Sequence, residues 1–316
     1  MRSKMEEIYP LRELPKNCMK LAGGKGKNLS IMAKNGLSVP EGFVILSCVF
    51  RRFLNQNKID SKIKNMLRGI RTNDIESLKK ISNKIREIIL KGKIPTEIEQ
   101  KILLNFKALN ARYVAVRSSA ISEDARRHSW AGELESYLNV TQNNLIRCVK
   151  KCWASLYTPR AIFYMLKMGL EREEMDVAVV VQKMVHSEVS GVCFTVDPVL
   201  GNKNHIAIES VFGLGELLVQ GKVIPDRYIV DKKTFRILKI RKALQQYMIT
   251  LHKGKNRIIS LPKEKIYMQK LSETQIKKLS KICVKIEKIF NCSQDIEWAL
   301  KERKFYILQS RPITTL

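Results

Sequence analysis

The chain has 316 residues, of which 58 are Lys or Arg and 30 are Asp or Glu, so its formal net charge is +28. With 45% hydrophobic residues it can bury a substantial core, yet no run approaches the ~20 consecutive apolar residues of a membrane span. Pro and Gly are too scarce for a disordered or fibrous chain, and the first residues carry no apolar stretch typical of a signal peptide. We therefore expect a basic globular protein of one or two domains, cytoplasmic and without a membrane partner.

The first third of the chain is predicted to be mainly helical. Apolar residues recur at helical spacing over 74–91, where Gly92 is placed to end the helix, and Pro95 suits the first turn of a second helix. The further elements expected before the middle of the chain are a helix at 95–108, a strand at 113–117, a strand at 135–140 and two helices within 142–168.

The second half is predicted to be rich in strands. Val177–Met184 is a near-continuous apolar run, as expected for a strand covered on both faces. Ser272 and Gln275 form a capping-box pattern at the start of a long helix at 273–290, and a β-hairpin closes the chain. Other strands are expected at 190–195, 205–212, 226–231 and 235–240. Helices beside mixed strands predict an α+β fold, or α/β with segregated halves.

The charge and the cysteines leave several interpretations open. No block of five or six like charges occurs, so the excess of Lys and Arg fits a solvated surface, an anionic ligand or an acidic partner, and a nucleic-acid-binding function has no other support. The seven cysteines form no CxxC pair, which argues against zinc and disulfide frameworks. We expect them to be small buried hydrophobes in a reducing compartment.

Two segments in the first half could bind phosphate. Gly23–Gly26 (GGKG) precedes a predicted helix from about Lys27, and glycines there let backbone N–H groups approach an anion that the helix dipole favours. Arg117 lies at the end of an apolar strand, its guanidinium suits phosphate oxygens, and the loop at 129–133 is small and polar enough to close over a ligand. The alternatives are a plain glycine turn, and an Arg117 that pairs with a carboxylate of its own loop.

The terminal hairpin gathers two carboxylates, an amide and a guanidinium. Side chains two apart on a strand share a face, so Asp295 and Glu297 point the same way, as do Gln309 and Arg311. A turn at 301–304 places Glu297 opposite Gln309 within about one residue. Oxygen ligands without His or Cys favour Mg²⁺ or Mn²⁺, and an arginine beside them is typical of phosphoryl transfer. A surface hairpin with ordinary charge pairs is the alternative.

Two patterns of lower specificity complete the candidates. Phe212–Glu216 (FGLGE) is a glycine turn that enters a helix. Gln182 and Met184 end the buried strand, where exposed backbone amides and an amide side chain could read the edge of an adenine.

Taken together, five segments resemble the N-terminal nucleotide-binding region of the phosphoenolpyruvate synthase, pyruvate phosphate dikinase and rifampin phosphotransferase superfamily. They are LAGGKGKNLS (21–30), VAVRSSAISEDARRHSWAGELESYLNV (114–140), VVVQKMVHSEVSGVCFTVDP (180–198), ESVFGLGELLVQGKVIPDRYIV (209–230) and QDIEWALKERKFYILQSRPITTL (294–316). The resemblance spans essentially the whole chain but only the first part of the family's multidomain polypeptide. It implies an ATP-grasp fold, with lobes at 1–183 and 184–316 that clamp ATP between sheets.

The resemblance also implies roles for single residues. Lys25 and Arg117 match phosphate-contacting residues, and Arg311 matches the arginine that holds the transferring phosphates, so these three form the implied catalytic set. The implied metal set is Asp295, Glu297 and Gln309, and the implied ATP-binding set also includes Gly24, Gln182, Met184 and Gly132 of the lid.

Two departures from the family pattern bear on activity. The lid reads Ala131-Gly132-Glu133 where the family commonly has Gln in third place, and a carboxylate there would repel a triphosphate unless it binds metal or points away. None of the four histidines stands in the T-S-H-A context of the family's phosphocarrier histidine. We therefore expect the carrier on a separate domain or protein, or an excised fragment.

The implied function is that of an ATP-binding module that converts Mg·ATP to AMP and transfers a phosphoryl group to a carrier histidine. The expected final acceptor is pyruvate. The alternative is a rifamycin-type antibiotic, because the ending QSRPITTL and the segment 150–164 look at least as close to that branch. A further alternative is a stand-alone module that binds the nucleotide without transfer, which Glu133 favours.

Overall fold

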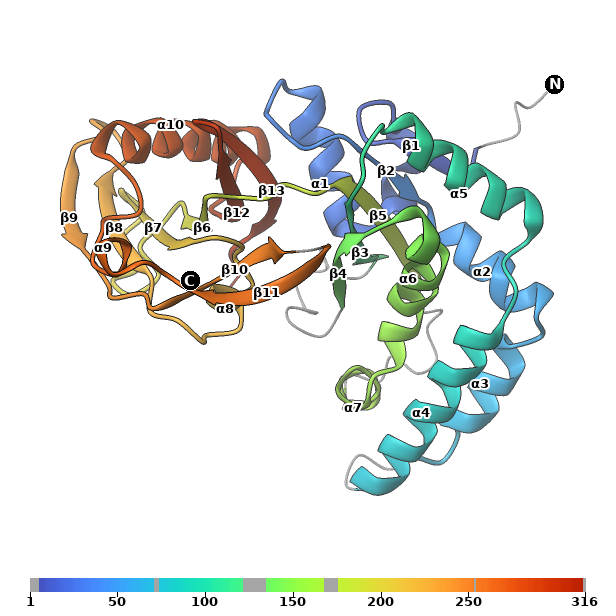
Figure 1. Cartoon of the computed structure of the whole chain (residues 1–316). Coiled ribbons are helices and arrows are strands. Elements are labelled where there is room, and N and C mark those ends of the chain that lie inside the picture. The colour runs from blue at the N-terminus through green and yellow to red at the C-terminus, as the bar shows by residue number, and fades with distance from the viewer. Residues whose placement is uncertain (1–5, 71–73, 122–134, 168–175, 253, 315–316) are drawn as a thin grey trace. The chain divides into compact units, whose positions relative to one another are not determined.

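The computed structural model contains two compact units (Figure 1). The residues that it describes are 6–70, 74–121, 135–167, 176–252 and 254–314. The first unit consists of Met1–Ser30 and Glu41–Met184, and the second of Ile31–Pro40 and Val185–Leu316. Each unit combines one large sheet with helices, which confirms the α+β fold class.

An antiparallel sheet of five strands, in the order β1-β2-β5-β3-β4, forms the centre of the first unit. The strands are β1 (Ile8–Pro10), β2 (Gly42–Ile45), β3 (Val114–Ala120), β4 (Ser136–Val140) and β5 (Val177–Lys183). Every residue of β5 except Lys183 is buried, because this strand lies between β2 and β3 with helices against it. The prediction of a strand covered on both faces is thereby confirmed.

Helices surround this sheet and supply much of its core. They are α2 (Ser47–Gln56), α3 (Asp60–Leu67), α4 (Ile75–Lys91), α5 (Thr96–Ala108), α6 (Gln142–Ala154) and α7 (Pro159–Lys167), with short 3₁₀ turns η1 (Lys16–Ala22) and η3 (Ser155–Tyr157). Helix α1 (Gly23–Lys34) belongs to this unit as far as Ser30, and its last residues belong to the second unit. The fully buried ring of Trp153 lies 4.9 Å from Phe53 and 5.6 Å from Phe50, between centroids. The predicted helices at 74–91 and 95–108 and the pair within 142–168 are confirmed.

Gly92 ends α4 as predicted, but for a different physical reason. Its φ is −58°, so the backbone is not in the left-handed region that usually selects glycine at a helix end. Instead a Cβ on Gly92 would lie 2.5 Å from the ring of Phe53. Close packing against α2, rather than the backbone angle, therefore requires a glycine there.

The second unit contains an antiparallel sheet of six strands in the order β13-β12-β6-β7-β8-β9. The strands are β6 (Val189–Phe194), β7 (His205–Phe212), β8 (Asp226–Asp231), β9 (Ile237–Arg241), β12 (Gln294–Lys301) and β13 (Lys304–Pro312). A separate ribbon pairs β10 (Tyr247–His252) with β11 (Lys255–Ser260), and α8 (Glu216–Val219) and α9 (Lys263–Ile266) are single turns.

Helix α10 (Glu273–Phe290) packs against this sheet. It begins at Ser272 with the predicted capping box, in which the Ser272 hydroxyl accepts from the Gln275 N–H. Alternate strand residues such as Ile296 and Trp298 are buried, whereas Asp295 and Glu297 between them are half-buried. The sheet therefore has one core face and one partly solvated, polar face.

A fully buried ion pair joins distant segments of the second unit. The Lys270 ammonium lies 2.8 Å from Asp226 Oδ1, and both side chains have no exposed surface. Asp226 also accepts from the Tyr228 hydroxyl and from the backbone N–H groups of Ala243 and Lys270. A buried pair of charges is tolerated in a protein interior when its remaining hydrogen-bonding capacity is satisfied in this way.

All seven cysteines lie in the described part of the chain, and none forms a disulfide. Five are buried and Cys48 is half-buried, as expected for small hydrophobes, but Cys292 is exposed because it follows the last turn of α10. Across the described ranges, no helix combines the length and the apolar character that a membrane span requires.

Candidate functional site

The GGKG segment is locked against strand β3. Helix α1 begins at Gly23, four residues earlier than the sequence predicts, so the glycines form its first turn. Gly23 has a φ of +67°, and a Cβ there would lie 2.2 Å from the Ser119 carbonyl oxygen. The Ser119 hydroxyl donates to the Ala22 carbonyl at 2.8 Å and accepts from the Gly26 N–H at 3.1 Å. No residue other than glycine fits at position 23 without a shift of β3 or of the helix.

This contact brings Lys25 and Arg117 to the same side of the first sheet. Strand β3 continues to Ala120, so Arg117 lies inside the strand rather than at its end, and only 8% of it is exposed. Because Arg117 and Ser119 are two apart, their side chains share a face, and Ser119 contacts the start of α1. Half-buried Lys25 and buried Gly24 belong to that first turn, where backbone N–H groups lack intrahelical partners.

The segment proposed to read adenine has its backbone amides already engaged. The N–H of Lys183 donates to the Glu41 carbonyl at 2.7 Å, and the N–H of Met184 donates to the Tyr113 carbonyl at 3.1 Å. The expectation of exposed amides at this strand end is therefore wrong, because the ends of β2 and β3 satisfy them. Gln182 is 2% exposed within β5, between Gly42 and Ala115. Any contact with adenine would use other atoms of this segment.

In the second unit, the hairpin of β12 and β13 brings its four polar residues together. The register pairs Glu297 with Gln309, as the spacing predicts, and also pairs Asp295 with Arg311. Asp295 Oδ2 accepts from Arg311 Nη2 at 2.6 Å and from Nε at 2.8 Å, an orientation that fixes the guanidinium plane. Burial raises the pKa of Asp295, and the charge of Glu297 adds to this rise, while Arg311 opposes it.

Glu209 and Arg227, which the sequence does not single out, extend this site across the sheet. Glu297 pairs with Val192, Val192 pairs with Glu209, and Glu209 pairs with Arg227, so these residues and Gln309 form one row on one face. Burial raises the pKa of Glu209, Arg227 opposes this rise, and the charge of Asp295 adds to it.

Arg227 is held in turn by Asp197, which follows β6. The distance from Arg227 Nη2 to Asp197 Oδ1 is 2.8 Å, and the Asp197 side chain is 3% exposed. The sequence carries one usable signal for this group, the charged residues Glu209 and Arg227 inside two predicted strands. The sequence does not show that these residues form a row with Glu297, because local pattern does not predict the pairing of strands that are far apart in the chain.

The donor set on this face suits a hard divalent cation. Asp295 and Glu297 offer carboxylate oxygens and Gln309 an amide oxygen, the ligand types that Mg²⁺ prefers. Within the described ranges, no three His, Cys, Asp or Glu side chains lie close enough together to hold a metal by themselves. The amide of Gln309 and the oxygens of a bound phosphate would therefore have to complete the coordination.

The predicted residues thus fall into two groups, each assembled within its own unit. The first unit holds Gly24, Lys25, Arg117, Gln182 and Met184, and the second holds Asp295, Glu297, Gln309 and Arg311. The lid at 129–133, with Gly132 and Glu133, and the carboxylates proposed to pair with Arg117 lie outside the described residues.

Comparisons with known proteins agree with the nucleotide-binding interpretation. The family described as pyruvate phosphate dikinase, AMP/ATP-binding domain matches residues 19–316. A probable phosphoenolpyruvate synthase of Archaeoglobus fulgidus is 44% identical over 312 residues, which is 97% of this chain and 41% of that protein. A rifampicin phosphotransferase of Bacillus cereus is 37% identical over 316 residues, which is 98% of this chain and 36% of that protein.

The chain therefore spans less than half the length of these two curated relatives. Among solved structures, D-alanyl-alanine synthetase A of Vibrio cholerae covers 74% of this chain and 54% of its own, with 13% identity and a TM-score of 0.29. That similarity is too low to bear on the fold.

Proposed function

This chain belongs to the pyruvate phosphate dikinase AMP/ATP-binding domain family, and from that premise we propose that it binds Mg·ATP and performs the first half of a dikinase reaction. In this half-reaction ATP becomes AMP, one phosphoryl group is transferred to a carrier histidine on a separate domain or protein, and the second is transferred to water and leaves as inorganic phosphate. Pyruvate is the proposed final acceptor, by analogy with the phosphoenolpyruvate synthases to which the chain is similar.

The observation that carries the proposal is the arrangement of the β12–β13 hairpin. Asp295 orients Arg311 through two hydrogen bonds, while 42% of the Arg311 side chain reaches solvent. A guanidinium fixed in this way is preorganised to stabilise charge that develops on a phosphate. Glu297 and Gln309 lie in the next row and would hold the cation. When bound, Mg²⁺ would neutralise charge on the phosphate oxygens.

In the first unit, a helix N-terminus and two basic side chains support the proposed binding of the ATP phosphates. Gly24 and Lys25 lie in the first turn of α1, whose N–H groups and dipole favour negative charge. Arg117 shares the sheet face to which this turn is attached. We propose that these residues bind the phosphates of ATP and that Arg311 supports the transfer step.

The test combines a binding measurement with a transfer assay. Calorimetry on the chain alone should show that Mg·ATP binds, and the absence of any binding would contradict the nucleotide proposal. The chain is then mixed with a protein that carries a T-S-H-A histidine, ideally the one encoded next to it, and AMP and phosphohistidine are followed. Binding without AMP for every such partner would contradict the dikinase step and support a stand-alone nucleotide-binding module.

A second candidate acceptor is a rifamycin-type antibiotic. The similarity to the Bacillus cereus rifampicin phosphotransferase extends over 98% of this chain, nearly the same share as for the Archaeoglobus fulgidus relative. Adding either pyruvate or rifampicin to the assembled system distinguishes the two, since only the true acceptor should become phosphorylated.

A further inference from the structure

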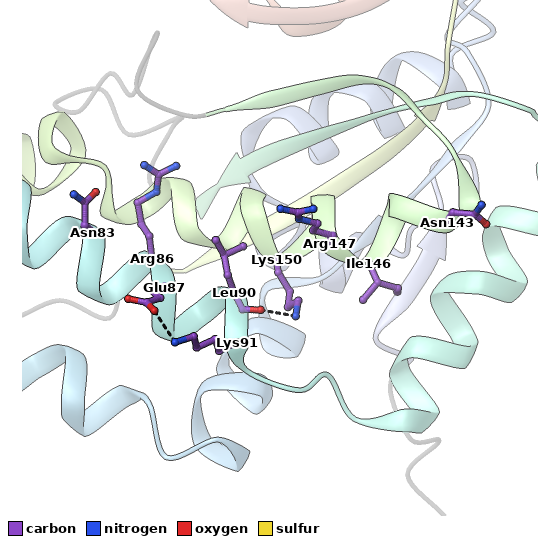
Figure 2. A pocket seen from close by; sticks show the side chains of 9 residues that line it. All are labelled: Asn83, Arg86, Glu87, Leu90, Lys91, Asn143, Ile146, Arg147 and Lys150. Atoms are coloured by element: carbon purple, nitrogen blue, oxygen red, sulfur yellow. Dashed lines mark hydrogen bonds and ion pairs between the residues drawn. The ribbon is translucent and has the colours of Figure 1, made fainter. Parts of the chain in front are cut away.

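An open groove of about 750 Å³ lies between α4 and α6 of the first unit (Figure 2). None of the residues predicted for the nucleotide site lines it. Leu90 of α4 and Ile146 of α6 contribute aliphatic surface, and both side chains are half-buried. Because two packed helices leave a groove that a third helix can fill, the shape suits a helical ligand.

The two helices carry a strong excess of positive charge. Helix α4 contains five Lys or Arg and two Glu, and α6 contains three Lys or Arg and no acidic residue. The two helices lie side by side, and the side chains that line the groove between them include four basic residues and one acidic residue, which are Arg86, Lys91, Arg147, Lys150 and Glu87. Such a surface attracts an acidic partner and repels a second copy of this chain.

Some of this charge is already balanced within the unit. The Lys150 ammonium donates to the carbonyls of Leu90 at 2.7 Å and Gly92 at 3.1 Å, and so closes the C-terminal end of α4. Lys91 lies 2.6 Å from Glu87, one turn away on the same helix. These two lysines shape the groove, but their interactions leave them poorly placed to bind a ligand.

Two arginines remain for a ligand. Arg147 is exposed and makes no hydrogen bond or ion pair with any residue that the structure describes. Arg86 meets Glu135 at 3.3 Å through its Nη2, and 33% of its side chain remains exposed. Figure 2 shows both guanidinium groups on the same side of the helix pair, with the Leu90 side chain between them in this view.

We propose that this groove is the docking site for an acidic amphipathic helix of a partner polypeptide. Aliphatic side chains of that helix would pack on Leu90 and Ile146, and its carboxylates would pair with Arg147 and Arg86, whose planar forks suit bidentate binding. Nucleic acid fits less well, because no aromatic side chain lines the groove to stack on a base. The proposal does not depend on ATP binding and can fail separately from it.

The test uses a fluorescent peptide of about 20 residues with Leu along one helical face and Glu elsewhere, titrated with the full chain and followed by anisotropy. The groove variant is Arg86→Gln/Arg147→Gln. The matched control is Lys263→Gln/Lys265→Gln, which removes the same charge from exposed residues in the second unit. We expect the groove variant to weaken binding at least tenfold and the control variant to change it by less than about twofold.

Hydrogen exchange with and without the peptide locates the contact. Protection confined to peptides from 75–91 and 142–154 supports the proposal. Equal loss of affinity in both variants, or protection spread over both units, would overturn it, since nonspecific attraction to a basic protein predicts those results.

Replacing every Glu of the peptide with Gln should abolish binding. An oligothymidylate that binds more tightly than the peptide and loses affinity in the groove variant would assign the groove to nucleic acid instead.

Discussion

The two groups of candidate residues, one in each unit, are held in place by different forces. In the first unit, the start of α1 and strand β3 are in contact so close that Gly23 has no room for a methyl group. In the second unit, the site lies on a partly solvated sheet face, where Asp295 and Arg311 orient each other by charge. The group in the first unit therefore depends on shape, and the group in the second unit depends on ionisation.

This difference predicts how each group of residues responds to substitutions and to pH. A tightly packed turn is sensitive to added volume and indifferent to pH, because no titrating group holds it. A row of half-buried carboxylates tolerates changes in size but responds to the loss of a charge partner and to pH. The four experiments below test this contrast, in order of decreasing expected effect.

The largest effect should come from the buried ion pair of the second unit. Lys270→Met leaves Asp226 buried without its cation, which should lower the free energy of unfolding by about 3–5 kcal/mol. Urea unfolding followed by circular dichroism measures the change. Lys263→Met, at an exposed position in α9, should change it by less than about 0.5 kcal/mol. A loss below about 1 kcal/mol for Lys270→Met would show that charge contributes little to this unit.

Arg311→Gln should reduce AMP formation in the assembled system by about 10²–10³-fold, because it removes a preorganised cation from the proposed transfer site. The fold should be largely unaffected, since 42% of the Arg311 side chain is exposed and solvent screens its pairing with Asp295. Arg303→Gln, in the turn of the same hairpin, is the control and should leave the rate unchanged. Equal rates for all three proteins would remove Arg311 from the mechanism.

Gly23→Ala should destabilise the first unit by about 2–4 kcal/mol, since the residue has a φ of +67° and its Cβ would overlap the Ser119 carbonyl. Gly69→Ala is the matched control. Its φ is +78°, but nothing lies within 4 Å of the added carbon, so only backbone strain of about 1 kcal/mol is expected. Calorimetric unfolding gives the loss of stability in each variant, and the difference between the two losses is the steric contribution at Gly23. Equal losses would mean that close packing does not hold this turn.

The smallest effect concerns Glu209, whose pKa is raised by burial and by Asp295. A carboxyl group whose pKa is raised in the folded state binds its proton more tightly there than in the unfolded chain. Its contribution to stability is therefore fully present below the unfolded-state pKa and is lost as pH rises through the folded-state pKa. Glu209→Gln should therefore gain stability over the parent at neutral pH, by less than about 1 kcal/mol because the side chain is partly exposed.

Below both pKa values, at about pH 3, Glu209→Gln and the parent should be equally stable. Denaturant unfolding at several pH values checks this, with Glu302→Gln on the exposed hairpin turn as the control. A gain that does not vary with pH would mean that ionisation of Glu209 is not its cause.

Much of the local structure could be predicted from the sequence. The helical spacing of isoleucines gave α4, the Ser272–Gln275 box gave the start of α10, and the spacing around the terminal turn gave the register of Glu297 with Gln309. Each of these depends on residues close together in the chain, where periodicity and capping chemistry act directly.

The strands that the sequence does not predict, or predicts too short, have a common physical cause, which is contact between distant segments. The sequence predicts that this strand ends at Arg117, yet β3 continues to Ala120 because it pairs with β5 there. The Ser118 hydroxyl donates to the Glu135 carbonyl, and the Ser119 hydroxyl donates to the Ala22 carbonyl. The short strands β1 and β2 and the β10–β11 ribbon were not predicted, since they are defined mainly by their partners.

The sequence by itself determined which residues are suited to phosphate and metal, and which neighbours on a hairpin face each other. Only the tertiary structure decided that Glu209 and Arg227 join the row of Glu297, that the amides of Lys183 and Met184 are engaged, and that α4 and α6 form a basic groove. The reason is that strand register and helix packing between distant segments follow from burial of the whole core, which no local pattern encodes.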